Sequence, residues 1–110
     1  MTDKRILALE NEADALRSQG SHAEAIEKMK AALEIDEKFV RGHLALAVLY
    51  NSTQQYDLAS RHGERACELE PEDTFNFVAL SVTYQRAFEG TRDPQYIQKA
   101  EYAKARSHGM

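Results

Sequence analysis

Four histidines and one cysteine are the side chains of this sequence best suited to metal binding or nucleophilic catalysis. They are His22, His43, His62, His108 and Cys67. A helical zinc site needs paired histidines, as in H-E-x-x-H, and the sequence has no such pair. A cysteine nucleophile needs a basic partner, and the sequence positions none beside it. We therefore expect no catalytic residue, no metal site and no cofactor, and we expect that the protein is not an enzyme.

Size and charge exclude further classes of function. The 110 residues carry a net charge of −4, from 14 basic and 18 acidic side chains. One domain spanning 1–110 is the simplest organisation. A nucleic-acid partner is disfavoured because there is no basic patch. Since no apolar run approaches about 18 residues, we expect neither a signal peptide nor a membrane contact. The single cysteine fits a reducing compartment, so we expect a cytoplasmic protein.

Apolar residues recur three and four positions apart, which predicts helices rather than strands. The stripe Ile6, Leu9, Ala13 and Leu16 is an example. Six helices are expected, over residues 3–18, 22–35, 38–52, 56–69, 73–88 and 95–107. The short connections between them predict antiparallel neighbours.

Three features are expected to mark the helix ends. Ser21 with Glu24 forms a capping-box pattern for the second helix. Asp36 is the expected N-cap of the third helix. Residues 89–93 are expected to form a loop after the fifth helix.

The helical pattern repeats every 34 residues, which is typical of stacked helix-pair arrays. Three sets of residues carry the period: Leu9, His43 and Phe77; Ala13, Ala47 and Ser81; Leu16, Tyr50 and Tyr84. Small residues in such a set allow close helix approach, and bulky ones fill the gaps between neighbouring pairs. His22 and His43 fall at bulky packing positions, and Cys67 lies on the apolar side of the fourth helix. Packing is therefore the expected role of these three side chains.

The repeat resembles the tetratricopeptide repeat (TPR) family pattern W-x2-L-G-x2-Y, A-x3-F, alanine and proline. The second unit has His43-x2-Leu46-Ala47-x2-Tyr50, then Ala59-x3-Gly63, Ala66 and Pro71. The first has Leu9-x2-Glu12-Ala13-x2-Leu16, then Ala25-x3-Met29 and Ala32, and the third opens with Phe77-x2-Leu80-Ser81-x2-Tyr84. The resemblance implies an all-α fold of three antiparallel helix pairs stacked as a right-handed superhelix, an α-solenoid. The approximate repeats are 6–39, 40–73 and 74–107.

The third unit departs from the period. Ala59 matches Ala100, and Tyr56 matches Ile97, only through a 41-residue step, seven longer than the period. We therefore expect an irregular third repeat, in which the fifth helix is lengthened or the last helix caps the stack.

In the TPR family, the first helix of each unit lines a concave groove. The resemblance assigns a partner-binding role to Arg41, Leu44, Val48, Asn51, Phe75, Val78, Val82 and Gln85. A subclass of the family clamps chaperone C-termini with basic and asparagine side chains. The matching positions here, Glu10, Asp14, Ala45, Phe75 and Ala79, offer no side-chain donor, so that role is not expected.

The expected function is a protein–protein interaction module, a scaffold or adaptor that binds an apolar or amphipathic peptide segment in the groove. The fifth helix is apolar nearly all round, so one of its faces needs a cover. That cover is a partner protein, the last helix, or a second copy of the chain in a homodimer. A different alternative is an accessory domain of a larger enzyme or secretion-apparatus protein.

Overall fold

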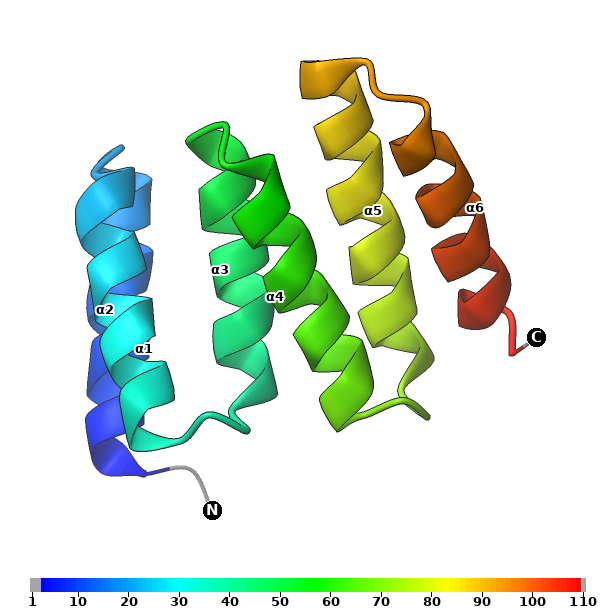
Figure 1. Cartoon of the computed structure of the whole chain (residues 1–110). Coiled ribbons are helices and arrows are strands. Elements are labelled where there is room, and N and C mark those ends of the chain that lie inside the picture. Colours follow the sequence, from blue (N-terminus) through cyan, green and yellow to red (C-terminus); the bar gives the residue numbers. More distant parts are fainter. Residues whose placement is uncertain (1–2, 110) are drawn as a thin grey trace.

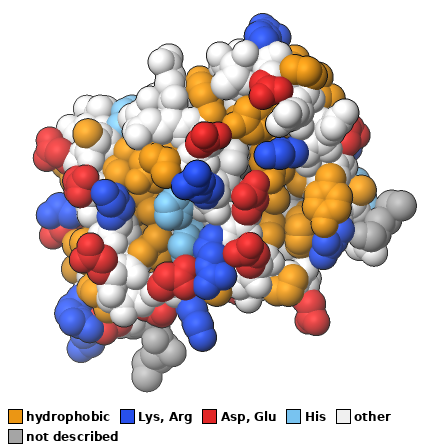
Figure 2. All heavy atoms as spheres, in the orientation of Figure 1, with side chains coloured by type: hydrophobic (Ala, Val, Ile, Leu, Met, Phe, Trp, Pro, Cys, Tyr) orange, Lys and Arg blue, Asp and Glu red, His pale blue; other side chains and the backbone are white. Residues whose placement is uncertain are grey.

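The computed structural model describes residues 3–109, which form three helix pairs side by side (Figure 1). Within this range there are helices and turns but no strand, as the sequence predicts. The helices are α1 (Lys4–Ser18), α2 (His22–Ile35), α3 (Val40–Ser52), α4 (Tyr56–Leu69), α5 (Thr74–Thr91) and α6 (Gln95–Ser107). Acidic and basic side chains are interspersed over the face in Figure 2, so no basic stripe crosses it.

One of the two expected N-caps is wrong, and the other lacks its side-chain hydrogen bond. Asp36 ends α2 instead of starting α3, and its Oδ1 accepts a hydrogen bond from the Lys38 amide at 3.0 Å. The N-cap of α3 is Phe39, because this local turn at Asp36 delays the helix. Ser21 does stand at the N-cap of α2, but its side chain makes no capping hydrogen bond.

The expected loop at residues 89–93 is also partly wrong, because α5 continues to Thr91. The Thr91 hydroxyl donates to the Ala87 carbonyl at 2.8 Å, and Arg92 ends the helix in the left-handed conformation, with φ of 61°. The added turn lies against the start of α4. The Tyr56 hydroxyl occupies the space where a side chain at Gly90 would begin, so only glycine admits this contact.

The second helices bury residues with a constant four-three spacing. The three sets are Ala25, Met29 and Ala32; Ala59, Gly63 and Ala66; and Tyr96, Ala100 and Ala103. The last step is therefore 37 residues, and the predicted match through 41 residues is wrong. The match fails because Tyr96 packs inward, whereas Ile97 remains 45% exposed.

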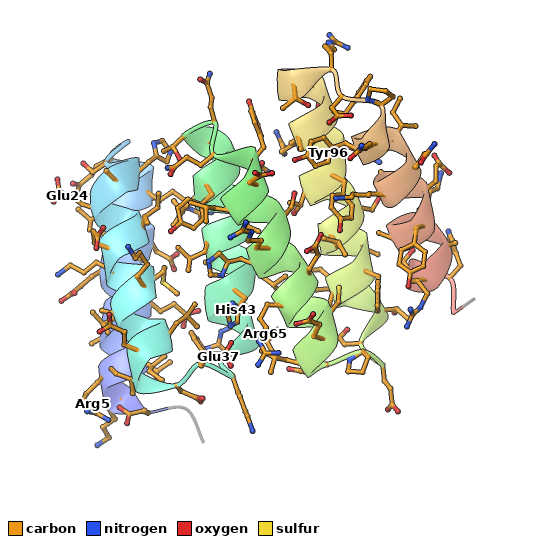
Figure 3. All side chains as sticks on the ribbon, in the orientation of Figure 1. Arg5, Glu24, Glu37, His43, Arg65 and Tyr96 are labelled. Carbon is orange, nitrogen blue, oxygen red and sulfur yellow. The ribbon has the colours of Figure 1, made fainter. Side chains whose placement is uncertain are left out.

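The buried side chains form two clusters. The N-terminal cluster joins α1, α2 and α3 around Ile6, Met29 and Leu46. The C-terminal cluster joins α4, α5 and α6 around Phe77 and Tyr84, and Tyr96 enters it from α6 (Figure 3). Because α4 contributes Ala59 to the first cluster and Cys67 to the second, it links the two, and α3 and α5 lie beside each other in the stack.

Candidate functional site

A groove runs between α3 and α5. It consists of an inner cavity of about 320 Å³ and an outer cavity of about 560 Å³. The two cavities share Val48, Asn51, Val82 and Arg86 as lining residues, so they form one continuous groove. Both cavity volumes are within the range of ligand sites, roughly 300–1,000 Å³.

The inner cavity has an apolar lining that remains open to solvent. Val48, Phe75, Val78 and Val82 are 42–63% exposed, although all are large apolar residues. Leu44 and the small side chains Ala47 and Ala79 complete the apolar wall. Contiguous exposed apolar side chains of this kind often mark interaction sites.

The structure brings six of the eight predicted groove residues together: Leu44, Val48, Asn51, Phe75, Val78 and Val82. Arg41 and Gln85 lie outside this lining. Arg41 is paired with α1, as described below, and Gln85 lines a hollow between α5 and α6.

The last helix does not fill the groove, so that alternative is wrong. α6 packs on the other side of α5, where Tyr84 and Tyr96 have ring centroids 6.2 Å apart. The packing stripe of α5 is thus covered by α6, whereas Val78 and Val82 stay exposed.

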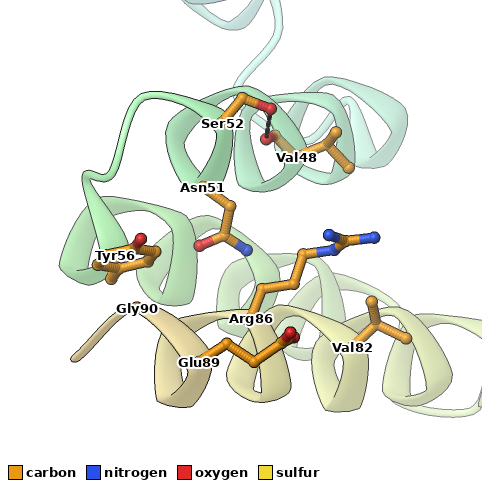
Figure 4. A pocket seen from close by; sticks show the side chains of 8 residues that line it. All are labelled: Val48, Asn51, Ser52, Tyr56, Val82, Arg86, Glu89 and Gly90. Atoms are coloured by element: carbon orange, nitrogen blue, oxygen red, sulfur yellow. Dashed lines mark hydrogen bonds between the residues drawn. The ribbon is translucent and has the colours of Figure 1, made fainter. Parts of the chain in front are cut away.

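The floor of the groove connects its two helices. The Asn51 amide nitrogen donates to the Thr83 carbonyl at 3.4 Å, a long hydrogen bond. The Thr83 hydroxyl donates to the Ala79 carbonyl at 2.9 Å, and the Ser52 hydroxyl to the Val48 carbonyl at 3.1 Å (Figure 4). These hydroxyls are already satisfied by their own helices, so they offer a ligand little free donor capacity.

Two arginines of the concave helices differ in their partners. Arg41 binds Glu10 of α1 through two hydrogen bonds of 3.0 Å. Arg86 lines both cavities and, within residues 3–109, makes no ion pair and no side-chain hydrogen bond. Its side chain rises from α5 into the gap toward Val48, whereas Glu89 lies along the helix (Figure 4). The groove therefore holds a guanidinium without an ion-pair partner beside apolar walls, and the Glu89 carboxylate lines the outer cavity as well.

Comparison with known proteins agrees with the helix-pair fold of α1 to α3. Residues 13–54 match the family model described as TPR repeat. The chain contains a TPR repeat. TPR repeats mediate protein–protein interactions, and their domains bind protein partners. No curated protein matches the chain. Of the helices described, none is long and apolar enough to cross a membrane.

Sequence reasoning missed the part of the TPR groove that α4 and the end of α5 form together. Tyr56, Glu89 and Gly90 line the outer cavity, at the meeting point of α4 and the last turn of α5. The signal was the lengthened third unit, but residues 89–93 were interpreted as a loop. Placing Glu89 and Gly90 on a helix would have put them one turn beyond Arg86.

The TPR stack also brings two histidines together on its second helix pair. His43 is 3% exposed, which confirms its packing role, and its Nδ1 lies 3.0 Å from Nδ1 of His62. The Nε2 of His43 lies 2.7 Å from the Glu37 carbonyl oxygen. Glu37 in turn binds Arg65 at 2.7 Å, and His43, Glu37 and Arg65 lie together at one end of α3 and α4 (Figure 3). The 19-residue separation of the two histidines gave no sequence signal for this contact.

The titration of these groups follows from their surroundings. Burial, together with the charge of His43, lowers the pKa of His62 to about 4. The hydrogen bond from Arg65 lowers the pKa of Glu37 to about 2. Burial raises the pKa of the Cys67 thiol to about 11, so the thiolate is disfavoured. Across residues 3–109, no group of three or more His, Cys, Asp or Glu side chains could hold a metal ion.

Proposed function

We propose that this TPR-containing protein is a scaffold or adaptor that binds an apolar or amphipathic peptide segment of a partner protein in the α3–α5 groove. The proposal assigns no catalytic step to the chain. The observation that carries it is the set of exposed apolar side chains, Val48, Phe75, Val78 and Val82, along one groove of a rigid stack.

The energetic argument rests on what these side chains do in the unbound protein. Each leaves apolar surface in water, and covering such surface contributes about 25 cal/mol per Å². The backbone groups of the groove are satisfied within helices, so an incoming segment need not disrupt the fold. The walls are held by the two buried clusters, and a preformed groove lowers the entropy cost of binding.

Selection of peptides from a random phage-displayed library against the wild-type protein tests the proposal. The enriched peptides are synthesised, and their binding is measured by fluorescence polarisation. Val48→Asp and Val82→Asp are expected to weaken binding at least about tenfold, because each places a charge on the apolar wall. Ile97→Asp is the matched control, since Ile97 is 45% exposed on α6 and lies outside the groove.

Binding that survives both groove substitutions would contradict the proposal. Size-exclusion chromatography with light scattering separates it from self-association. A wild-type dimer that dissociates with Val48→Asp would assign the groove to a second copy of the chain, whereas a monomer that binds peptide supports the proposal.

A further inference from the structure

We propose that the segment bound in this groove carries an acidic side chain at one end of its apolar stretch, and that Arg86 pairs with this carboxylate. This inference rests on the proposed function and specifies its ligand. It is carried by the position of Arg86, which lines both the apolar inner cavity and the more polar outer cavity.

The first step is that Arg86 has no internal partner. Within residues 3–109 its guanidinium forms no ion pair, whereas Arg41 is bound by both carboxylate oxygens of Glu10. Glu89 also lines the outer cavity, three residues further along α5, yet no ion pair joins the two side chains. A helical i,i+3 partner is therefore available to Arg86, and the charge nevertheless extends into the groove (Figure 4).

The second step is what binding would do to that charge. A segment that covers Val48 and Val82 also covers the guanidinium between them and removes water from it. An unpaired cation under an apolar ligand is costly, and a carboxylate from the ligand offsets this cost through a charge-assisted hydrogen bond. A lysine at the same place in the ligand would add repulsion, so the site discriminates by charge.

The third step is the order of groups along the ligand. The walls are apolar from Phe75 to Val82, whereas Ser52 and Glu89 line the end beyond Arg86. Phe75 and Arg86 are 11 positions apart on α5, about 16 Å along a helix axis. The expected ligand is thus an apolar stretch of about 16 Å that ends at an acidic side chain.

The test uses the library-selected peptides and charge variants of the protein. For each peptide whose binding is abolished by Val82→Asp, the acidic residue of the peptide is changed to glutamine and to lysine. We expect the glutamine form to bind about three- to tenfold more weakly and the lysine form more weakly still. Arg86→Glu should reverse this order, so that the lysine form binds best. Arg61→Glu makes the same charge change at an exposed residue of α4 outside the groove, and it should leave the order unchanged.

The outcomes separate the two proposals. Groove-dependent peptides that lack an acidic residue, or whose order does not change with Arg86→Glu, would overturn this inference and leave the proposed function standing. If no selected peptide depends on Val48 or Val82, both fail. An order that reverses with Arg86→Glu but not with Arg61→Glu establishes Arg86 as a residue that determines specificity.

Discussion

Two junctions between the first helices of neighbouring pairs differ: α1 and α3 form a closed junction, whereas α3 and α5 form an open one. Between α1 and α3, Glu10 and Arg41 meet in a two-point ion pair, with both hydrogen bonds at 3.0 Å. Between α3 and α5, the direct link is one long hydrogen bond, from Asn51 to Thr83 at 3.4 Å. The first junction neutralises its charges internally, whereas the second leaves apolar walls and a free guanidinium.

The difference shows which positions of the repeat hold the stack together and which are free to vary. Ala13 and Ala47 are buried at matching packing positions of the two helices, so each helix can approach its own partner closely. The concave positions are not needed for that packing. They can hold an ion pair in one unit and a groove in the next, so recognition can be confined to the C-terminal part of the surface.

The largest expected effect separates the packing stripe from the groove on a single helix. Leu46→Ala should lower the free energy of unfolding by about 2–5 kcal/mol, because Leu46 is fully buried in the N-terminal cluster. Val48→Ala, two residues away and 50% exposed, should cost less than about 1 kcal/mol. Urea denaturation followed by circular dichroism measures both. Equal losses would mean that the groove is part of the core.

Acid should destabilise the second helix pair, α3 and α4, more than the rest of the stack. The pKa of His62 is about 4 in the fold, below the ordinary value of about 6.5. As the pH falls from about 6.5 to 4, His62 binds a proton in the unfolded chain but not in the folded chain. The free energy of unfolding therefore decreases over that pH range. Above pH 7 this group contributes no pH dependence. With a discount for the solvent exposure of the ring, the loss should be about 1–2 kcal/mol.

The control for the acid effect is His62→Gln, which removes the titrating group. Its unfolding free energy should fall less steeply than that of the wild type between pH 6.5 and 4. Hydrogen exchange at pH 5 should show the first loss of protection in α3 and α4, where His43 and Tyr50 stack on His62. Identical pH slopes for the two proteins would contradict the assignment.

The sequence predicted most of the fold because local and repeated signals agree. The three-four spacing determines each helix, and the 34-residue period places Ala13 with Ala47 and Tyr50 with Tyr84. The prediction from sequence was wrong where tertiary contacts determine the helix ends and the buried face. The added turn of α5 depends on Tyr56 lying against Gly90, and the burial of Tyr96 rather than Ile97 depends on how α6 docks. Neither contact produces a periodic pattern in the sequence.

The candidate site was predictable to a similar degree. Six groove residues follow from the TPR resemblance, which assigns a groove-lining role to positions offset from the packing stripe on α3 and α5. The pairing of Arg41 with Glu10 did not follow, since a 31-residue separation between two long side chains has no pattern. The lack of an ion-pair partner for Arg86 likewise cannot be predicted from the sequence, because it depends on where the acidic side chains lie in the fold.

A smaller effect is expected from the closed junction. A double-mutant cycle with Glu10→Ala and Arg41→Ala should give a coupling energy of about 0.5–1 kcal/mol, near the upper end for an ion pair of this exposure. The geometry is two-point, but the Arg41 side chain is 57% exposed, so solvent screens the attraction. Raising the salt concentration should reduce the coupling. A coupling that is zero at low salt would remove the distinction drawn between the two junctions.

The smallest effect is expected at the open junction, and it is the sharper test of the comparison. Arg86→Ala should change the free energy of unfolding by less than about 0.5 kcal/mol, because it breaks no ion pair within residues 3–109. If Arg86 instead stabilised the fold through its contact with the groove walls, the loss would equal or exceed that of Arg41→Ala. Thermal and urea unfolding of the two alanine variants side by side decides this. A silent Arg86 in the free protein, together with an Arg86 that controls peptide charge preference, would mean that its charge acts in recognition and not in folding.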